Sequence, residues 1–157
     1  MKITLLNIGK TSDDYLREGI ALYCTRLKHY THFELVDIEI PSKWHKLPSY
    51  ELMKKEAEFQ LKQMGKADFS VILDEKGKML SSVEFSGFIE QRAVQSVRHL
   101  IFVTGGSWGF DPSVRQSAHW KLSLSPMTFP HQMVRLVFLE QLYRAFTILR
   151  GEQYHNP

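Results

Sequence analysis

Three short segments carry residue types that suit ligand binding, and each follows an apolar run typical of a β-strand. Glycines at a strand end let a ligand approach the backbone, and a loop of small and apolar residues offers backbone N–H and C=O groups between apolar walls. Such segments suit a ligand that joins an aromatic base to a polar tail. The three segments are Leu73-Asp74 with Gly77, Gly105-Gly106 with Gly109, and the L-S-P-M-T-F loop from Leu124 to Phe129.

Familiar catalytic motifs do not account for these segments. The sequence G-G-S-W-G from Gly105 is not the G-x-G-x-x-G fingerprint of dinucleotide-binding proteins, and the chain contains no P-loop. Ser107 or Ser125 could pair with His131 as nucleophile and base, but the G-x-S-x-G context is missing. The seven histidines are scattered and complete no set of metal ligands, so no metal is expected.

The order of the expected elements indicates how these segments are positioned. Apolar runs predict strands at 2–8, 33–40, 69–73, 100–104 and 121–125, and helical spacing predicts helices at 12–27, 50–64, 82–96, a short one from 111 and a long one from 130. This alternation predicts an α/β fold with a parallel sheet flanked by helices. Ligands bind beyond the carboxyl ends of such strands, where the three segments are expected to meet. With no long linker, residues 1–157 are predicted to form a single domain.

Two of the expected helices have distinctive faces. The helix at 50–64 is expected to bury Met53, Ala57, Leu61 and Met64 and to expose its Lys- and Glu-rich side. The last helix is apolar almost all round; Thr128 is expected to cap it and Gly151 to end it. Its polar stripe, which could meet water, consists of Glu140, Arg144 and Thr147. A helix of this kind is buried on most sides, which predicts that a second subunit covers it.

Composition narrows the class of protein. Of the 157 residues, 43% are hydrophobic and 24% charged, as in ordinary globular proteins. Cys24 is the single cysteine, so no intramolecular disulfide forms and a reducing compartment is favoured. No apolar run reaches the length of a membrane span or of a signal peptide, so we expect a cytoplasmic protein without a membrane partner. A net charge of +3 weakly favours a polyanionic partner.

Six motifs run through the chain from end to end. They are K-I-T-L-L-N-I-G-K from Lys2, V-I-L-D-E-K-G-K-M-L-S-S from Val71, F-V-T-G-G-S-W-G from Phe102, L-S-L-S-P-M-T-F-P-H-Q-M-V-R from Leu122, E-Q-L-Y-R-A-F from Glu140 and R-G-E-Q-Y-H from Arg150. Each is modest alone, but together they resemble the RlmH family, the small ribosomal RNA large subunit methyltransferases of the SPOUT class.

This resemblance implies a fold and an activity that the spacing does not reveal. It implies a C-terminal trefoil knot, a rare exception among folds, and a homodimer that acts on the assembled ribosome. It implies methylation of N3 of the pseudouridine at position 1915 in helix 69 of 23S rRNA. The implied contacts of the cofactor, S-adenosylmethionine (SAM), are Leu73, Gly105, Leu124, Ser125, Pro126, Met127, Thr128 and Phe129.

The resemblance also implicates the tail residues Tyr154 and His155 in catalysis. A sulfonium methyl group is already activated, so the enzyme must mainly orient the reactants and needs no metal. N3 must lose its proton, and His155 is the candidate group to take it, because histidine exchanges protons near neutral pH. Arg144 could stabilise charge on the base, Tyr154 could stack on it, and His131 lies near the cofactor loop. Family tails commonly carry Lys or Arg after this His, whereas Asn156-Pro157 follows here.

Other interpretations remain open from the residues alone. Arg144 is equally suited to an i, i+4 ion pair with Glu140. A non-catalytic dimeric RNA-binding protein could use the same basic surface, and a small hydrolase could use a Ser–His pair. The candidate phosphate contacts are Lys10, Arg17, Lys43 and Lys46, each of which is more often a solvated charge.

Overall fold

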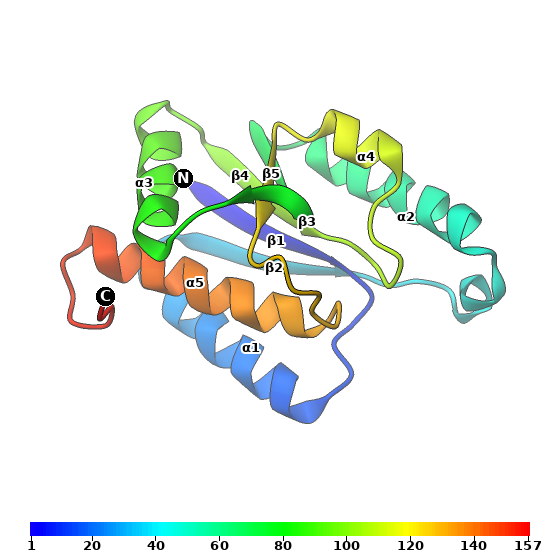
Figure 1. Ribbon diagram of the computed structural model, residues 1–157, viewed down its shortest axis with the longest axis horizontal. Helices are drawn as coiled ribbons and strands as arrows, with labels where there is room; N and C mark the ends of the chain where they lie inside the picture. The colour runs from blue at the N-terminus through cyan, green and yellow to red at the C-terminus, as the bar shows by residue number, and fades with distance from the viewer.

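The computed structural model describes residues 1–157. The fold is built on one five-stranded parallel sheet (Figure 1). The strands are β1 (Lys2–Ile8), β2 (His32–Ile38), β3 (Phe69–Met79), β4 (His99–Thr104) and β5 (Trp120–Ser123). Their order across the sheet is β2-β1-β4-β3-β5, and every neighbouring pair is parallel. The predicted α/β fold is thus confirmed. All five carboxyl ends lie along one edge of the sheet.

Helices cover both faces of the sheet (Figure 1). Helices α1 (Asp14–Leu27), α3 (Ser82–Val94) and α5 (Met133–Leu149) pack on one face over a buried cluster that includes Leu5 and Phe102. Helices α2 (Ser49–Met64) and α4 (Pro112–Ser117) pack on the other face over a cluster that includes Leu6 and Val103. Neighbouring strand residues therefore alternate between the two faces. The short 3-10 helix η1 (Ser42–Lys46) connects β2 to α2.

Helix α5 begins three residues later than the sequence predicted. The N–H groups of Met133 and Val134 donate to the Pro130 carbonyl, and Gln132 at the N-cap makes no side-chain capping bond. The expected Thr128 cap was wrong, because the Thr128 hydroxyl donates instead to Glu75, 3.3 Å away on the β3 segment. The loop before α5 is therefore tied to the sheet and does not start the helix.

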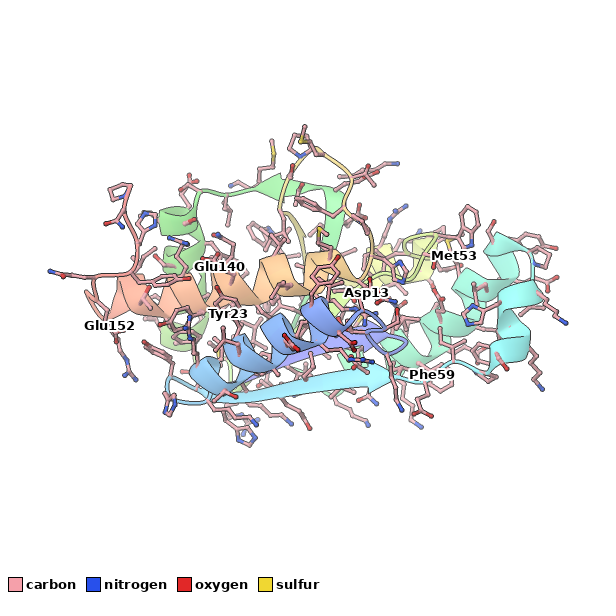
Figure 2. The ribbon with its side chains drawn as sticks, turned by 90° about the horizontal axis from the view of Figure 1, so that it is seen from below. Asp13, Tyr23, Met53, Phe59, Glu140 and Glu152 are labelled. Atoms are coloured by element: carbon pink, nitrogen blue, oxygen red, sulfur yellow. The ribbon has the colours of Figure 1, made fainter.

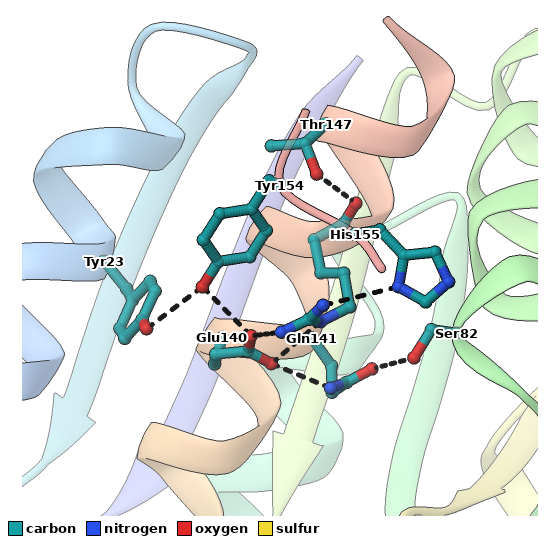
Figure 3. A network of polar contacts seen from close by, with 8 residues as sticks. Tyr23, Ser82, Glu140, Gln141, Thr147, Tyr154 and His155 are labelled. Carbon is teal, nitrogen blue, oxygen red and sulfur yellow. Dashed lines mark hydrogen bonds and ion pairs between the residues drawn. The ribbon is translucent and has the colours of Figure 1, made fainter. Parts of the chain in front are cut away.

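The end of α5 matches the prediction. Gly151 has a φ of +67° and donates its N–H to the Ile148 carbonyl, while the Glu152 N–H donates to Thr147. These two bonds form a Schellman motif, in which glycine takes the left-handed conformation. The chain then turns back along α5, so that Tyr154 and His155 lie against the last turns of the helix (Figure 3).

The chain itself covers most of α5. The helix packs between α1 and α3, and Leu136 fits against Gly19, where an added Cβ would lie 2.9 Å from a Leu136 methyl carbon. Thr147 is fully buried, so the expectation that the polar stripe meets water was wrong for this residue. Arg135 is also fully buried and donates to Thr11 and to the Ile8 carbonyl. The apolar pattern of α5 therefore does not by itself require a second subunit.

Strand β3 is longer than predicted. It continues beyond Leu73 to Met79, because Leu122 of β5 pairs with both Leu73 and Lys78 across an irregularity in β3. The backbones approach closely there: a Cβ on Gly77 would lie 2.6 Å from the carbonyl carbon of Lys121. The sequence showed only a loop because its polar residues carry no strand pattern.

Helices α1, α2 and α3 differ in detail from the predictions. Ser12 does not cap α1; its N–H and hydroxyl both donate to Gln132, at 2.8 and 3.0 Å. Ser81 rather than Ser82 caps α3, in a capping box with Glu84. The buried side of α2 is shifted from the predicted one, because Met53 is only half-buried. It consists of Leu52, Glu56, Ala57, Gln60 and Met64.

The C-terminal tail and helix α2 lie at opposite ends of the molecule. Figure 2 shows Glu152 of the tail and Met53 of α2 at opposite ends, with Tyr23 and Glu140 toward the tail. No helix is long and apolar enough to cross a membrane.

Candidate active site

The carboxyl ends of β3, β4 and β5 enclose a cavity of about 300 Å³, which we call the strand-end cavity. The register places Leu73 of β3 beside Thr104 of β4 and Leu122 of β5, so the loops that follow these strands meet. Pro126 does not line the cavity, but all the other predicted cofactor residues do. These are Leu73, Gly105, Leu124, Ser125, Met127, Thr128 and Phe129.

Glycines shape one wall of this cavity. A Cβ on Gly105 would lie 3.1 Å from the backbone of Gly109, and Gly106 forms an antiparallel bridge with Gly109. Gly109 has a φ of +84°, in the region that glycine enters without steric cost. The G-G-S-W-G sequence therefore makes a tight turn whose backbone faces the cavity.

Charged side chains also line the cavity. Asp74 is 6% exposed and accepts a hydrogen bond from the Arg115 Nε at 2.8 Å and from the Lys76 N–H at 3.0 Å. Arg115 is a site residue that the sequence did not reveal, because it lies 41 positions from its partner. The predicted cap of its helix is confirmed: Asp111 accepts from the Ser113 N–H at 2.9 Å.

His131 is the one predicted catalytic residue that lines the strand-end cavity. Burial lowers the pKa of its imidazole, and the Arg135 guanidinium lowers it further, so the ring is held neutral. Ser107 and Ser125 line the same cavity, but neither hydroxyl is hydrogen-bonded to His131; Ser125 instead accepts from the Met127 N–H at 2.9 Å. A nucleophilic Ser–His pair therefore has no support in this geometry.

The other three predicted catalytic residues, Arg144, Tyr154 and His155, meet toward the C-terminal end of α5, where Figure 3 labels Tyr154 and His155. Arg144 is ion-paired with Glu140, as spacing allowed, and its Nη1 lies 3.3 Å from His155 Nδ1. The Tyr154 hydroxyl donates to Glu140 at 3.1 Å and lies 3.4 Å from the Tyr23 hydroxyl. We call this set the tail cluster: Tyr23, Glu140, Arg144, Tyr154 and His155.

Contacts within the tail cluster raise the pKa of two of its members, Tyr154 and Arg144. Burial raises the pKa of the Tyr154 phenol well above its ordinary value, and the Tyr23 and Glu140 contacts raise it further. The pKa of Arg144 is also raised, chiefly by its bond to Glu140. Because a guanidinium can only donate, His155 accepts through Nδ1, which leaves Nε2 as the N–H of the neutral ring.

The two groups of candidate residues are well separated within one chain. Val134 lines the strand-end cavity, and Glu140 and Arg144 of the tail cluster lie six and ten residues further along α5, which corresponds to about 9 and 15 Å along the helix axis. The structure thus brings His131 to the strand-end cavity but places Arg144, Tyr154 and His155 elsewhere. No three His, Cys, Asp or Glu side chains come together as a metal site.

The walls of the strand-end cavity fit an adenosine-like ligand. Leu73, Leu122, Leu124 and Phe129 supply apolar surface for a flat base, and the turn at Gly105 supplies backbone groups. The carboxylates of Asp74 and Glu75 line the same space and suit hydroxyl or ammonium donors. The cavity therefore combines apolar walls with a few polar groups, as small-molecule sites do.

Comparisons with known proteins identify the class. Residues 1–155 match the family model described as "Predicted SPOUT methyltransferase". A probable methyltransferase from Bordetella pertussis Tohama I shares the fold, with a TM-score of 0.56 and 10% identity over 92% of this chain and 95% of that one. With its parallel sheet and ligand cavity after the last strands, the chain belongs to the SPOUT methyltransferase family. Its cofactor is S-adenosylmethionine, which supplies an activated methyl group when bound.

Two relatives place the chain more closely within that family. The ribosomal RNA large subunit methyltransferase H of Cytophaga hutchinsonii is 47% identical, over 99% of this chain and 100% of the relative. The protein of the same name from Parabacteroides distasonis is 45% identical, over 99% of both chains. The chain is a methyltransferase of this H type, and the resemblance seen in the sequence is confirmed.

Proposed function

We propose that this enzyme methylates N3 of the pseudouridine at position 1915 of 23S rRNA, on the assembled ribosome and in the cytoplasm. Its full-length relatives are named as methyltransferases of the ribosomal RNA large subunit. The observation that carries the proposal is the convergence of three distant segments, after β3, β4 and β5, on one cavity with adenosine-like complementarity. The trefoil knot around this cavity stays a prediction of the resemblance.

We further propose that the active enzyme is a homodimer. None of Arg144, Tyr154 and His155 lines the strand-end cavity, and Arg144 lies ten residues, about 15 Å along the helix axis, beyond Val134, which does. A second copy, related by a two-fold axis, can bring its tail cluster to the first copy's cavity. The dimer would then complete the active site as well as enlarge the surface that holds rRNA.

In this arrangement the tail cluster recognises the target base. Arg144 stabilises the negative charge that develops on the base as N3 loses its proton. Tyr154, a neutral phenol, stacks on the base or donates a hydrogen bond to it. His155 presents its Nε2 N–H as a donor while Arg144 occupies its Nδ1 lone pair. His131 orients the reactants from the cavity side.

The basic residues predicted to contact phosphates are not equivalent. Lys10 is paired with Glu39 at 2.5 Å, and Arg17 is paired with Asp14. Lys43 and Lys46 lie exposed in η1 and make no ion pair. We therefore assign the stronger phosphate contacts to η1, which projects beside the carboxyl edge of the sheet (Figure 1).

Methyl transfer to ribosomes from a strain that lacks this modification tests the proposal. We expect the purified protein and radiolabelled SAM to add one methyl group per ribosome, found by mass spectrometry at N3 of this pseudouridine. Sedimentation should give twice the 18.3 kDa chain mass. Binding of SAM without any methylated product would favour the non-catalytic RNA-binding alternative, and a methyl group on another nucleotide would contradict the assigned target.

A further inference from the structure

A second cavity, of about 390 Å³, adjoins the strand-end cavity, and we call it the adjoining cavity. It lies between the ends of β1 and β4, where the connections diverge: α1 leaves β1 on one face of the sheet and α4 leaves β4 on the other. Open α/β sheets bind ligands at such a topological switch point. The two cavities share Gly106, Ser107 and His131 as a common wall.

Glu56 of α2 lines the adjoining cavity and has no protein partner. Glu56 is 3% exposed, and its carboxylate is neither hydrogen-bonded nor ion-paired to another group of the protein. Its oxygens are not among the fully buried atoms that lack a partner, so they reach the open space of the cavity. The carboxylate lies directly under the glycine turn, because a Cβ on Gly106 would be 2.5 Å from Glu56 Oε2. A carboxylate that faces a cavity and has no donor from the protein is free to accept a hydrogen bond from a molecule bound there, which makes Glu56 a candidate ligand contact.

We propose that the adjoining cavity receives the target base and that Glu56 accepts the proton of its reacting imide N–H. This proposal rests on the proposed function. As the N–H proton passes to the Glu56 carboxylate, the nitrogen lone pair forms the bond to the methyl carbon and the carbon–sulfur bond breaks, leaving a neutral thioether. The protonated Glu56 then returns its proton to water through the cavity.

The position of the carboxylate suits this step better than that of either histidine. His155 has its Nδ1 lone pair occupied by Arg144, and His131 is held neutral with a lowered pKa, which makes it a weak base. Burial raises the pKa of Glu56 to about 7, close to the value at which a general base works best near neutral pH. The other titratable groups that line the cavity are Lys10 and Glu39, which pair with each other, and His45 of η1.

Glu56→Gln tests the proposal, with the exposed Glu58→Gln on the same helix as the matched control. We expect Glu56→Gln to lower kcat for ribosome methylation by about 100-fold or more, because it removes the general base. SAM affinity by calorimetry should stay within about twofold, Glu56→Asp should recover part of the rate, and Glu58→Gln should match the wild type. The rise of kcat with pH toward about 7 should be absent in Glu56→Gln and retained in His131→Asn.

A stability measurement separates this role from a structural one. The folded protein holds the Glu56 proton up to about pH 7, whereas the unfolded chain releases it near 4.5, so the wild type loses stability relative to Glu56→Gln as the pH rises between these values. The variant should therefore melt at a higher temperature than the wild type at pH 8.

Three results would overturn the inference. Methylation by Glu56→Gln within about twofold of the wild type shows that the carboxylate takes no proton. If Glu56→Gln loses SAM affinity in parallel with its rate, then Glu56 contacts the methyl donor SAM and not the target base. If kcat of Glu56→Gln still rises with pH toward about 7, then another group causes that rise. Absence of methylation by the wild type itself would instead count against the proposed function.

Discussion

The strand-end cavity and the tail cluster differ in what holds them together. The cavity is shaped by strand ends and by glycines, and a methyl group added at Gly105 would lie 3.1 Å from the backbone of Gly109. The tail cluster is held by side-chain hydrogen bonds among residues of α1, α5 and the tail (Figure 3). The first region lines a cavity, whereas the second offers donors and charge and lines none of the molecule's three main cavities. We infer that each supplies half of an active site that two chains complete.

Removal of the tail should have the largest effect. Truncation after Gly151 deletes Tyr154 and His155 but leaves every residue of the strand-end cavity. We expect methyl transfer to fall by about 100-fold or more, because groups that act on the base are lost, with SAM affinity unchanged by calorimetry. Truncation after His155 is the control and should keep full activity. Full activity of the shorter protein would show that the tail cluster has no catalytic role.

Mixed dimers should show whether the tail cluster of one chain acts on the strand-end cavity of the same chain or of the partner chain. Gly105→Val adds a side chain at a position where even a Cβ would lie 3.1 Å from the Gly109 backbone, so the cavity should narrow and this variant should lose SAM binding. Mixed in equal amounts with the chain truncated after Gly151, it should recover about a quarter of wild-type activity, since half the dimers carry one complete site. If the tail served the cavity of its own chain, the mixture would remain inactive. Each variant alone provides the baseline.

Gly77→Ala should test how tightly β3 packs against β5 beside the cavity. The new Cβ would lie 2.6 Å from the Lys121 carbonyl carbon, where β3 passes β5. We expect a loss of about 1–3 kcal/mol in unfolding free energy, measured by urea denaturation, because backbone must shift to admit the methyl group. Gly87→Ala, at a position with open space around the added Cβ, is the control. An unchanged midpoint for Gly77→Ala would show that this crossing is loosely packed.

The smallest effect is expected from Tyr154→Phe. This change removes the hydroxyl that donates to Glu140 but keeps the ring, which packs edge-on against Tyr143 with centroids 4.8 Å apart. We expect a loss of about 1 kcal/mol or less in unfolding free energy, the net value of one hydrogen bond. A loss as large as that of Gly77→Ala would mean that the tail cluster is as intolerant of change as the packing of β3 against β5 beside the cavity.

Much of the strand-end cavity was predictable because its signals are local. Apolar runs marked the strands, and the glycines and the S-P-M-T-F loop marked where they end. Parallel strands bring their carboxyl ends to one edge, so the three segments had to meet once the fold class was known. The caps predicted at Asp111 and Gly151 are confirmed for the same reason, since capping depends on a few neighbouring residues.

The errors involve residues whose partners lie far along the chain. Thr128 has the type of an N-cap but bonds to Glu75, and Ser12 bonds to Gln132. Polar β3 residues pair with β5 without any strand-like pattern, and Arg115 reaches Asp74. No short window of sequence contains both members of such a pair, so local preference was overridden by tertiary contact.

The sequence by itself determined the family, the order of the elements and the loops that form the strand-end cavity. Only the tertiary structure decided that Arg135, Thr147 and Glu56 are buried, and that Tyr154 and His155 fold back onto Arg144. Burial depends on which elements pack together, and a charged side chain has the same letter whether it meets water or a cavity. For this reason the carboxylate of Glu56 became a candidate for catalysis only in three dimensions.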